Sequence, residues 1–162
     1  MARIGVTGHM NITEDTVLLV YNAISKVLAE DENPAELVGV SCIARGADSV
    51  FAQAVLDVNG RLEVVLPSRN YRERKVKPDH AALFDNLLGR ADTVRVMDFD
   101  DAGREAYEAA NEAMLSSCDR LIAVWDGGAG EKGGTGTVVE LARARGVPVD
   151  VLWPEGAARK QD

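Results

Sequence analysis

The sequence predicts an α/β fold: one domain of three layers, α/β/α, with helices on both faces of a mostly parallel sheet. Short apolar runs alternate with longer amphipathic runs along the whole chain. This alternation is typical of parallel strands that are buried on both faces. The chain of 162 residues is long enough to bury one core. No repeat, low-complexity segment or linker divides it.

Six apolar runs bounded by glycine, proline or polar residues are expected to be strands. They are residues 3–7, 37–41, 62–66, 93–97, 121–125 and 147–152. Apolar residues spaced three and four positions apart predict the helices. These helices cover residues 13–30, a segment after Gly46 that includes 50–58, and residues 79–89, 103–117 and 137–145. We expect residues 1–156 to form the domain and residues 157–162 to be a flexible tail.

Composition and charge narrow the function classes. The net charge is −8, and because proteins that bind nucleic acid use basic surfaces, a nucleic-acid partner is disfavoured. No apolar run is long enough to cross a membrane, and no secretory leader is evident, so we expect a cytoplasmic protein. Cys42 and Cys118 stand apart and are expected to be reduced, buried thiols. No metal-ligand spacing appears, so no protein-bound metal or cofactor is expected, although Mg²⁺ could arrive with a polyphosphate ligand.

The loops that follow the strands are the expected ligand site. Right-handed crossovers place every strand-to-helix loop of such a sheet along one edge, at the carboxyl ends of the strands. Open α/β sheets bind their ligands at this edge. Four of these loops are rich in glycine or polar residues. We therefore expect them to meet around one ligand.

The glycine-rich loop before the last helix is the strongest signal. It contains Gly133, Gly134, Thr135, Gly136 and Thr137, followed by Glu140. Glycines let the backbone approach a phosphate closely, and the next helix offers free N–H groups and a partial positive charge. The alternative is that Thr137 and Glu140 form a capping box that merely starts the helix. The loop lacks the lysine of a Walker A motif and is not the dinucleotide motif of a dehydrogenase.

Three other loops supply candidate ligand-binding residues. Arg45 offers guanidinium donors to a phosphate or carboxylate, and Asp48 could accept from a ribose hydroxyl. The alternative for this pair is a surface ion pair beside a glycine turn. Residues 69–77 hold five of the 18 basic residues, which suits a lid over an anion or else a solvated charge run. The full set from these loops is Thr7, Gly8, His9, Ser41, Arg45, Gly46, Asp48 and Tyr71, where Tyr71 could stack on a base.

Two of these motifs resemble a known superfamily. Residues 41–48 are similar to the Ser-Gly-x-Ala-x-Gly-x-Asp motif of the DNA-processing protein DprA, with Cys42 in place of the glycine. Residues 133–140 are similar to the Pro-Gly-Gly-x-Gly-Thr-x-x-Glu motif of the "Lonely Guy" (LOG) phosphoribohydrolases, without the proline. The chain thus resembles the SLOG superfamily of Rossmann-like nucleotide-binding domains, which also includes the molybdenum-cofactor carrier proteins. An Arg-Lys pair on the preceding helix accompanies the LOG glutamate, whereas residues 108–114 here contain no arginine or lysine.

Three functions are therefore expected, in this order. The first is a small sensor or carrier that binds a nucleotide or nucleotide-derived phosphate. The second is hydrolysis of the N-glycosidic bond of a nucleoside 5′-monophosphate, with Glu140 as the acid/base or cation stabiliser and Arg45 assisting it. The third is DprA-like binding of single-stranded nucleic acid through residues 69–77. The resemblance also implies a homodimer, for which the apolar faces of helices 13–30 and 79–89 are candidates.

Overall fold

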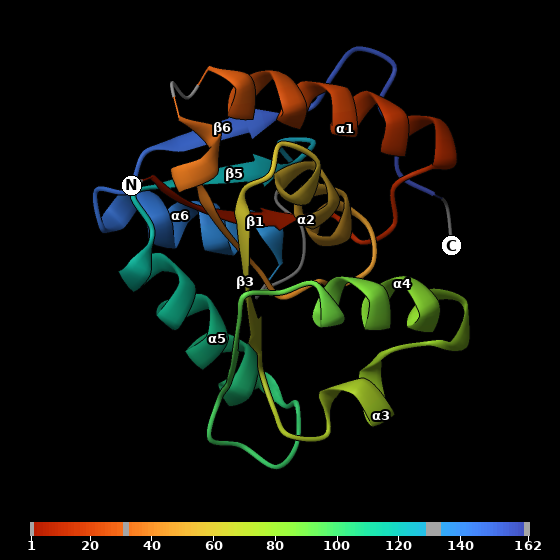
Figure 1. The fold of residues 1–162 in the computed structure, drawn as a ribbon, viewed down its shortest axis with the longest axis vertical. Coiled ribbons are helices and arrows are strands. Elements are labelled where there is room, and N and C mark those ends of the chain that lie inside the picture. Colours follow the sequence, from red (N-terminus) through yellow and green to blue (C-terminus); the bar gives the residue numbers. More distant parts are fainter. Residues whose placement is uncertain (1, 31–32, 129–133, 161–162) are drawn as a thin grey trace.

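The computed structural model describes residues 2–30, 33–128 and 134–160, which form a six-stranded sheet in the order β4-β3-β2-β1-β5-β6 (Figure 1). Every strand pair is parallel, so the predicted α/β fold is confirmed. The strands are β1 Arg3–Gly8, β2 Val38–Ser41, β3 Arg61–Leu66, β4 Thr93–Val96, β5 Arg120–Val124 and β6 Val149–Leu152.

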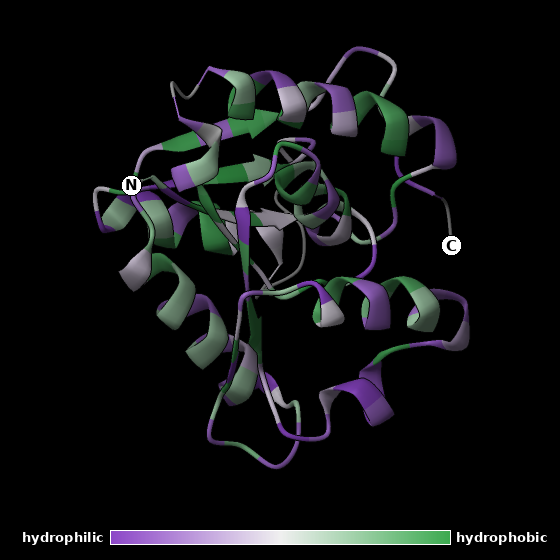
Figure 2. Ribbon diagram, viewed as in Figure 1, coloured by the Kyte–Doolittle hydropathy of each residue, from purple (hydrophilic) through white to green (hydrophobic). Residues whose placement is uncertain are grey.

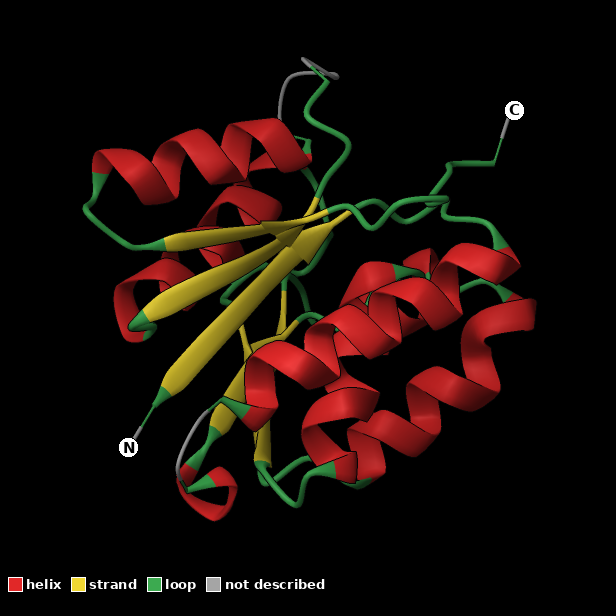
Figure 3. Ribbon diagram, turned by 90° about the horizontal axis from the view of Figure 1, so that it is seen from above, coloured by secondary structure: helices red, strands yellow, loops and turns green. Residues whose placement is uncertain are grey.

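Helices cover both faces of the sheet (Figure 3). On one face α1 and α4 both pack against α2, and on the other face α5 lies against β3 and β1 while α6 lies against β1, β5 and β6. The helices are α1 Glu14–Ala29, α2 Ala47–Asp57, α3 Tyr71–Lys75, α4 Pro78–Gly89, α5 Arg104–Ser117 and α6 Thr135–Ala144, with a 3-10 turn at Pro34–Glu36.

The start of α1 follows from its sequence. The Thr13 side chain accepts a hydrogen bond from the N–H of Thr16, and two acidic residues occupy the first turn. Val20, Ile24 and Leu28, spaced four apart, are all buried on the sheet side. The N-cap and the apolar face thus agree with the sequence prediction.

The start of α6 differs from the prediction. The helix begins at Thr135, two residues before the expected start, and its N-cap is Gly134, which offers no side-chain cap. The capping-box interpretation of Thr137 and Glu140 is therefore wrong, because Thr137 already lies inside the first turn. Gly134 and Gly136 are poor helix formers, so these residues indicated a loop. In the structure a Cβ added to Gly136 would lie 3.3 Å from the ring of Trp125, which accounts for a small residue inside the helix.

Hydrophobic residues occupy much of the strands, whereas hydrophobic and hydrophilic residues alternate along the helices (Figure 2). Phe51 of α2 and Phe84 of α4 are among the largest fully buried side chains. On the other face, Leu121 of β5 packs with Met114 of α5 and Val138 of α6. The buried carboxylate of Glu63 is paired with Arg3, at 2.5 Å from Nη2 to Oε2. Both faces of the sheet are thus covered by packed cores.

The order of the strands reverses at β1. This strand pairs with β2 on one side and with β5 on the other. The chain leaves β1 toward one face of the sheet, through α1, and leaves β5 toward the opposite face, through α6. Such a switch point opens a crevice at the carboxyl ends of the two strands, which is where α/β sheets bind ligands.

The segment predicted as a flexible tail lies against the loop after β1. Residues 157–160, which we call the C-terminal strap, form an isolated antiparallel bridge between Arg159 and Ile12. The N–H of Thr13 donates to the carbonyl of Ala158, and the N–H of Lys160 donates to the carbonyl of Asn11. The strap is thereby placed beside the carboxyl edge of the sheet, and its flexibility stays a prediction.

The described part of the chain holds no helix that is both long and apolar enough to span a membrane. Within those same residues, no group of three or more His, Cys, Asp or Glu side chains is arranged to hold a metal ion. Cys42 and Cys118 are free and only partly buried, and burial raises the pKa of both thiols, that of Cys118 to about 11.

Candidate functional site

The loop after β1 is built for close packing. A Cβ added to Gly8 would lie 2.5 Å from Cβ of Ala47 and 2.8 Å from Cβ of Val124. Only glycine lets α2 and β5 approach β1 this closely. Thr7, the preceding residue, is in register with Ala123 of β5. Close packing against Ala47 and Val124 thus explains why residue 8 is glycine. Contacts of Thr7 and Gly8 with a ligand stay predictions.

His9 joins three loops of the carboxyl edge. Its side chain is buried, its Nε2 accepts a hydrogen bond of 3.1 Å from the N–H of Asp126, and its ring meets Trp153 edge-on. Burial, and then the nearby positive charge of Arg159, lower the His9 pKa, while Asp126 acts in the opposite direction. Through its contacts with Asp126 and Trp153, the ring links the loops after β1, β5 and β6.

The loop after β2 is organised by a buried hydroxyl, that of Ser41, and carries a half-buried carboxyl, that of Asp48. Ser41 is fully buried; its hydroxyl accepts from the N–H of Ile43 and donates to the carbonyl of Asp48. Burial raises the pKa of the Asp48 carboxyl to about 7, while a hydrogen bond from the Ala44 backbone acts the other way. Both residues face the protein itself, and their predicted ligand contacts stay predictions.

Gly46 adopts a positive φ of +81° at the N-cap of α2. A Cβ there would lie 2.6 Å from the carbonyl oxygen of His9 and 2.7 Å from that of Met10. The N–H of Ala47 also donates to the His9 carbonyl. Gly46 therefore locks the loops after β1 and β2 together, and this packing accounts for the glycine.

The basic segment 69–77 is ordered, and much of its charge is already paired. Arg69 forms ion pairs with Asp98 and Asp100, and Arg72 forms a bidentate pair with Asp85. These pairs keep the pKa of both arginines above the ordinary value. The segment thus forms α3 and the lead into α4, and the mobile lid stays a prediction.

Tyr71 is more deeply buried than its charged neighbours in the sequence indicate. Its side chain is only 5% exposed, and its ring lies between Phe84 at 6.1 Å and Tyr107 at 6.4 Å between ring centroids. Burial is also the main cause of its raised pKa. Tyr71 nevertheless lines the basic pocket described next, and its stacking on a base stays a prediction.

A basic pocket lies where the loops after β1, β2 and β3 meet. Its volume is about 360 Å³, within the range of small-molecule sites. Four cationic side chains line it: Arg45, Lys75, Lys77 and Lys160. Arg45 is paired with Asp79. Buried His80 fixes the pocket wall, because its Nε2 lies 3.1 Å from the carbonyl of Ile43 and 3.3 Å from the hydroxyl of Ser49.

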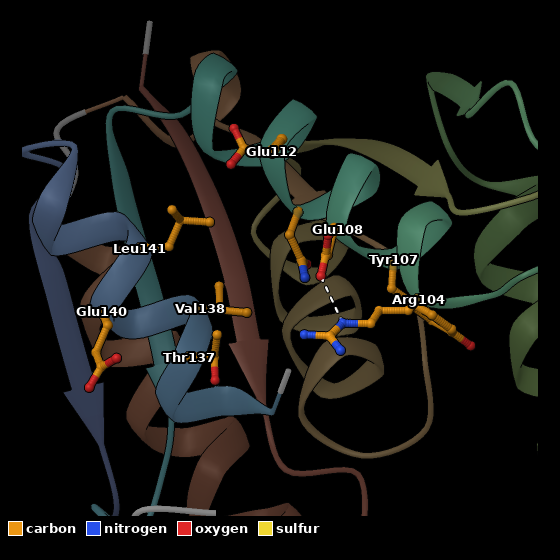
Figure 4. A pocket seen from close by; sticks show the side chains of 9 residues that line it. Arg104, Tyr107, Glu108, Glu112, Thr137, Val138, Glu140 and Leu141 are labelled. Atoms are coloured by element: carbon orange, nitrogen blue, oxygen red, sulfur yellow. Dashed lines mark hydrogen bonds and ion pairs between the residues drawn. The ribbon is translucent and has the colours of Figure 1, made fainter. Parts of the chain in front are cut away.

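The residues of the glycine-rich loop line a different depression. A groove of about 760 Å³ runs between α5 and α6 and is lined by Thr137, Glu140 and Arg104, among others. Figure 4 shows Arg104 extending from α5 toward α6, paired with Glu108, while the carboxylate of Glu140 lies on the side of α6 turned away from it. Gly133 lies outside the described residues. Gly134 and Thr135 precede and begin the helix.

The structure thus divides the candidate residues into two groups. Arg45 lines the basic pocket and Glu140 lines the α5–α6 groove, and the two depressions share no lining residue among those described. The predicted assistance of Glu140 by Arg45 is not supported by this geometry. Sequence reasoning missed Lys160, Asn11 and His80 in the basic pocket and Arg104 in the groove. The cationic charge of Arg104, one turn before residue 108, was the signal that could have drawn attention to it.

Comparison with known proteins identifies the fold. No family model and no curated protein sequence matches the chain. Among solved structures, it is similar to DNA processing protein A (DprA) from Streptococcus pneumoniae, with a TM-score of 0.70 and 18% identity over 96% of this chain and 52% of that one. DprA from Helicobacter pylori gives a TM-score of 0.67 and 15% identity over 98% and 68%.

A third solved structure, the Moco carrier protein from Chlamydomonas reinhardtii, gives a TM-score of 0.56 and 20% identity over 95% of this chain and 78% of that chain. The chain spans about half the length of the Streptococcus DprA chain, so the match is to one part of that protein. This chain therefore has the Rossmann-like α/β fold seen in these DprA and Moco carrier protein structures.

Proposed function

We propose that this protein binds a nucleotide, or another phosphorylated small molecule, at the carboxyl edge of its sheet and acts as a sensor or carrier. The observation that carries the proposal is the basic pocket, because it gathers Arg45, Lys75, Lys77 and Lys160 from separate segments of a chain with a net charge of −8. Local positive charge in an acidic protein selects anions. The location agrees with the rule for open α/β sheets.

The phosphate of the ligand would lie among these cations. Arg45 stands at the end of the loop after β2, where its guanidinium could pair with a phosphate in place of Asp79. The exposed side chain of Met10, at 57%, and the partly buried Val76 supply apolar wall for the sugar or base. Residues 134–137 remain a predicted second anchor for phosphate, at the N-terminus of α6.

Titration calorimetry with nucleoside monophosphates, cyclic nucleotides and sugar nucleotides tests the proposal. We expect saturable heat with at least one of these classes, and a weakening of about tenfold in Arg45→Ala, because a charge-assisted contact is lost. Arg61→Ala is the matched control, since Arg61 is exposed at the amino end of β3. Absence of heat with every class, or equal weakening in both variants, would count against the proposal.

Hydrolysis of a nucleoside 5′-monophosphate is the second candidate. The α5–α6 groove supports it, because Thr137 and Glu140 of the LOG-like motif line it together with the cation Arg104. Release of free base from AMP by the wild type, lowered at least a hundredfold in Glu140→Gln and little changed in Glu155→Gln, is the expected result for an enzyme. Chromatographic detection of the base measures it. Base release that persists in Glu140→Gln would remove Glu140 from the chemistry.

The homodimer stays part of the proposal. The helices α1 and α4, expected to form its interface, each expose a large apolar side chain: Leu18 at 67% and Leu83 at 42%. These are the residues that a contact between two copies through those helices would bury.

A further inference from the structure

We infer that the ligand of the basic pocket carries a compact group of at least three negative charges, as a nucleoside diphosphate or triphosphate does, rather than a single phosphate. The inference rests on the proposed function and specifies its ligand class. It is carried by the number of unpaired cations in the pocket, the segments that hold them and the absence of acidic side chains from the lining described.

The charges of the pocket do not cancel. Among the described residues, no ion pair involves Lys75, Lys77 or Lys160, and all three side chains are exposed. Arg45 is the fourth cation, and Asp79 already balances it. The pocket therefore holds an excess of about three positive charges, whereas a phosphate monoester brings at most two negative charges. A diphosphate or triphosphate matches the excess.

The lysines come from two parts of the chain that the fold brings together: the short link between α3 and α4, and the C-terminal strap. Lys75 ends α3, Lys77 is the N-cap of α4, and Lys160 belongs to the C-terminal strap. The strap is held in place by backbone hydrogen bonds, including one of 2.6 Å from the N–H of Lys160 to the carbonyl of Asn11. The Asn11 side-chain amide also donates to the carbonyl of Lys160 at 3.3 Å. These bonds place the backbone of Lys160 beside the loop after β1, and its side chain lines the pocket.

The volume and walls favour a compact polyanion. At about 360 Å³ the pocket is at the small end of ligand sites, so it suits one mononucleotide and not a dinucleotide. The aromatic side chains of the described lining are Tyr71 and His80, which are only 5% and 8% exposed, so they present little surface for the base stacking that single-stranded nucleic acids use. Recognition therefore falls mainly on the charged group.

A series of probes with an increasing number of phosphates tests this inference on the chain of 162 residues. Adenosine mono-, di- and triphosphate, together with inorganic phosphate and tripolyphosphate, are titrated by calorimetry at low salt, in EDTA and again with Mg²⁺. We expect affinity to rise at least tenfold from the monophosphate to the triphosphate, and tripolyphosphate to bind more tightly than phosphate. Added salt should weaken the triphosphate more than the monophosphate, because more charges are screened.

Variants of the lysines show where the charges act. Lys75→Ala, Lys77→Ala and Lys160→Ala should each weaken triphosphate binding about threefold to tenfold. Each should therefore reduce the difference in affinity between the triphosphate and the monophosphate. Lys26→Ala, which removes an exposed lysine of α1, is the matched control and should leave the affinities for the mono-, di- and triphosphate unchanged. Thermal unfolding of each variant checks that the fold is retained.

The outcomes separate the two proposals. Equal affinity for the mono- and triphosphate overturns this inference while nucleotide binding itself stands. The same holds if the lysine variants leave the affinity difference between the two unchanged. No binding of any nucleotide or polyphosphate overturns both. Tighter binding of a single-stranded oligonucleotide than of the triphosphate would also overturn it, in favour of an extended polyanion.

Discussion

Gly46→Ala should lower the free energy of unfolding by about 3 kcal/mol or more. The residue adopts a φ of +81°, which costs energy for any side chain but glycine. The new Cβ would also lie 2.6 Å and 2.7 Å from the backbone oxygens of His9 and Met10. Backbone atoms cannot rotate away as a flexible side chain can. The loop after β1 would have to shift, and with it the hydrogen bond from the His9 N–H to the Val124 carbonyl.

Urea unfolding followed by circular dichroism measures this loss. Gly89→Ala is the control, because nothing lies within 4 Å of a Cβ at that position, in the last turn of α4. We expect the control to unfold at the same urea concentration as the wild type, or at a slightly higher one. An unfolding midpoint for Gly46→Ala equal to that of the control would show that the two loops are not locked together as described.

Asp48→Asn should make the protein more stable than the wild type at pH 8 and equally stable near pH 4. Burial raises the Asp48 pKa from its ordinary value of 3.8 to about 7. The folded protein therefore binds this proton more tightly than the unfolded chain does. Between pH 4 and pH 7 the unfolded chain has lost the proton and the folded protein retains it, so the wild type loses stability as the pH rises.

The size of this effect is a few kcal/mol, about 4 at most, since each pKa unit corresponds to about 1.4 kcal/mol. Asparagine cannot ionise, and its side-chain oxygen can still accept the hydrogen bond from the Ala44 backbone. Free energies of unfolding at pH 4, 6 and 8 test this in the wild type, Asp48→Asn and the exposed control Glu155→Gln. A difference between wild type and Asp48→Asn that does not grow with pH would contradict the burial of the charge.

The strands could be predicted from the sequence because their apolar runs reflect burial on both faces, as in residues 62–66 and 121–125. The start of α6 was placed two residues too late, because Gly134 and Gly136 are poor helix formers and indicated a loop up to Thr137. The burial of Tyr71 was not foreseen, because a lone aromatic residue in a charged run resembles a surface residue. Its burial depends on Phe84 and Tyr107, which are distant in sequence.

The candidate site was only partly accessible to sequence reasoning. The carboxyl edge follows from the alternation of strands and helices, and Arg45 was found because its loop borders that edge. The sequence did not indicate two separate depressions. They arise because α6, which carries Thr137 and Glu140, lies on the face of the sheet opposite to α4. Lys160 was missed because the strap contact is a pairing between residues nearly 150 positions apart, such as Ile12 with Arg159.

The position of β1 at the centre of the sheet has a consequence for synthesis on the ribosome. Gly5 pairs with Val40 early in the chain, but its other partner, Leu121, follows 116 residues later. At roughly 5–20 residues per second, that partner emerges on the order of ten seconds after β1. During this interval the β5-facing edge of β1 has unpaired backbone groups, so the nascent chain is most vulnerable there to pairing with another strand.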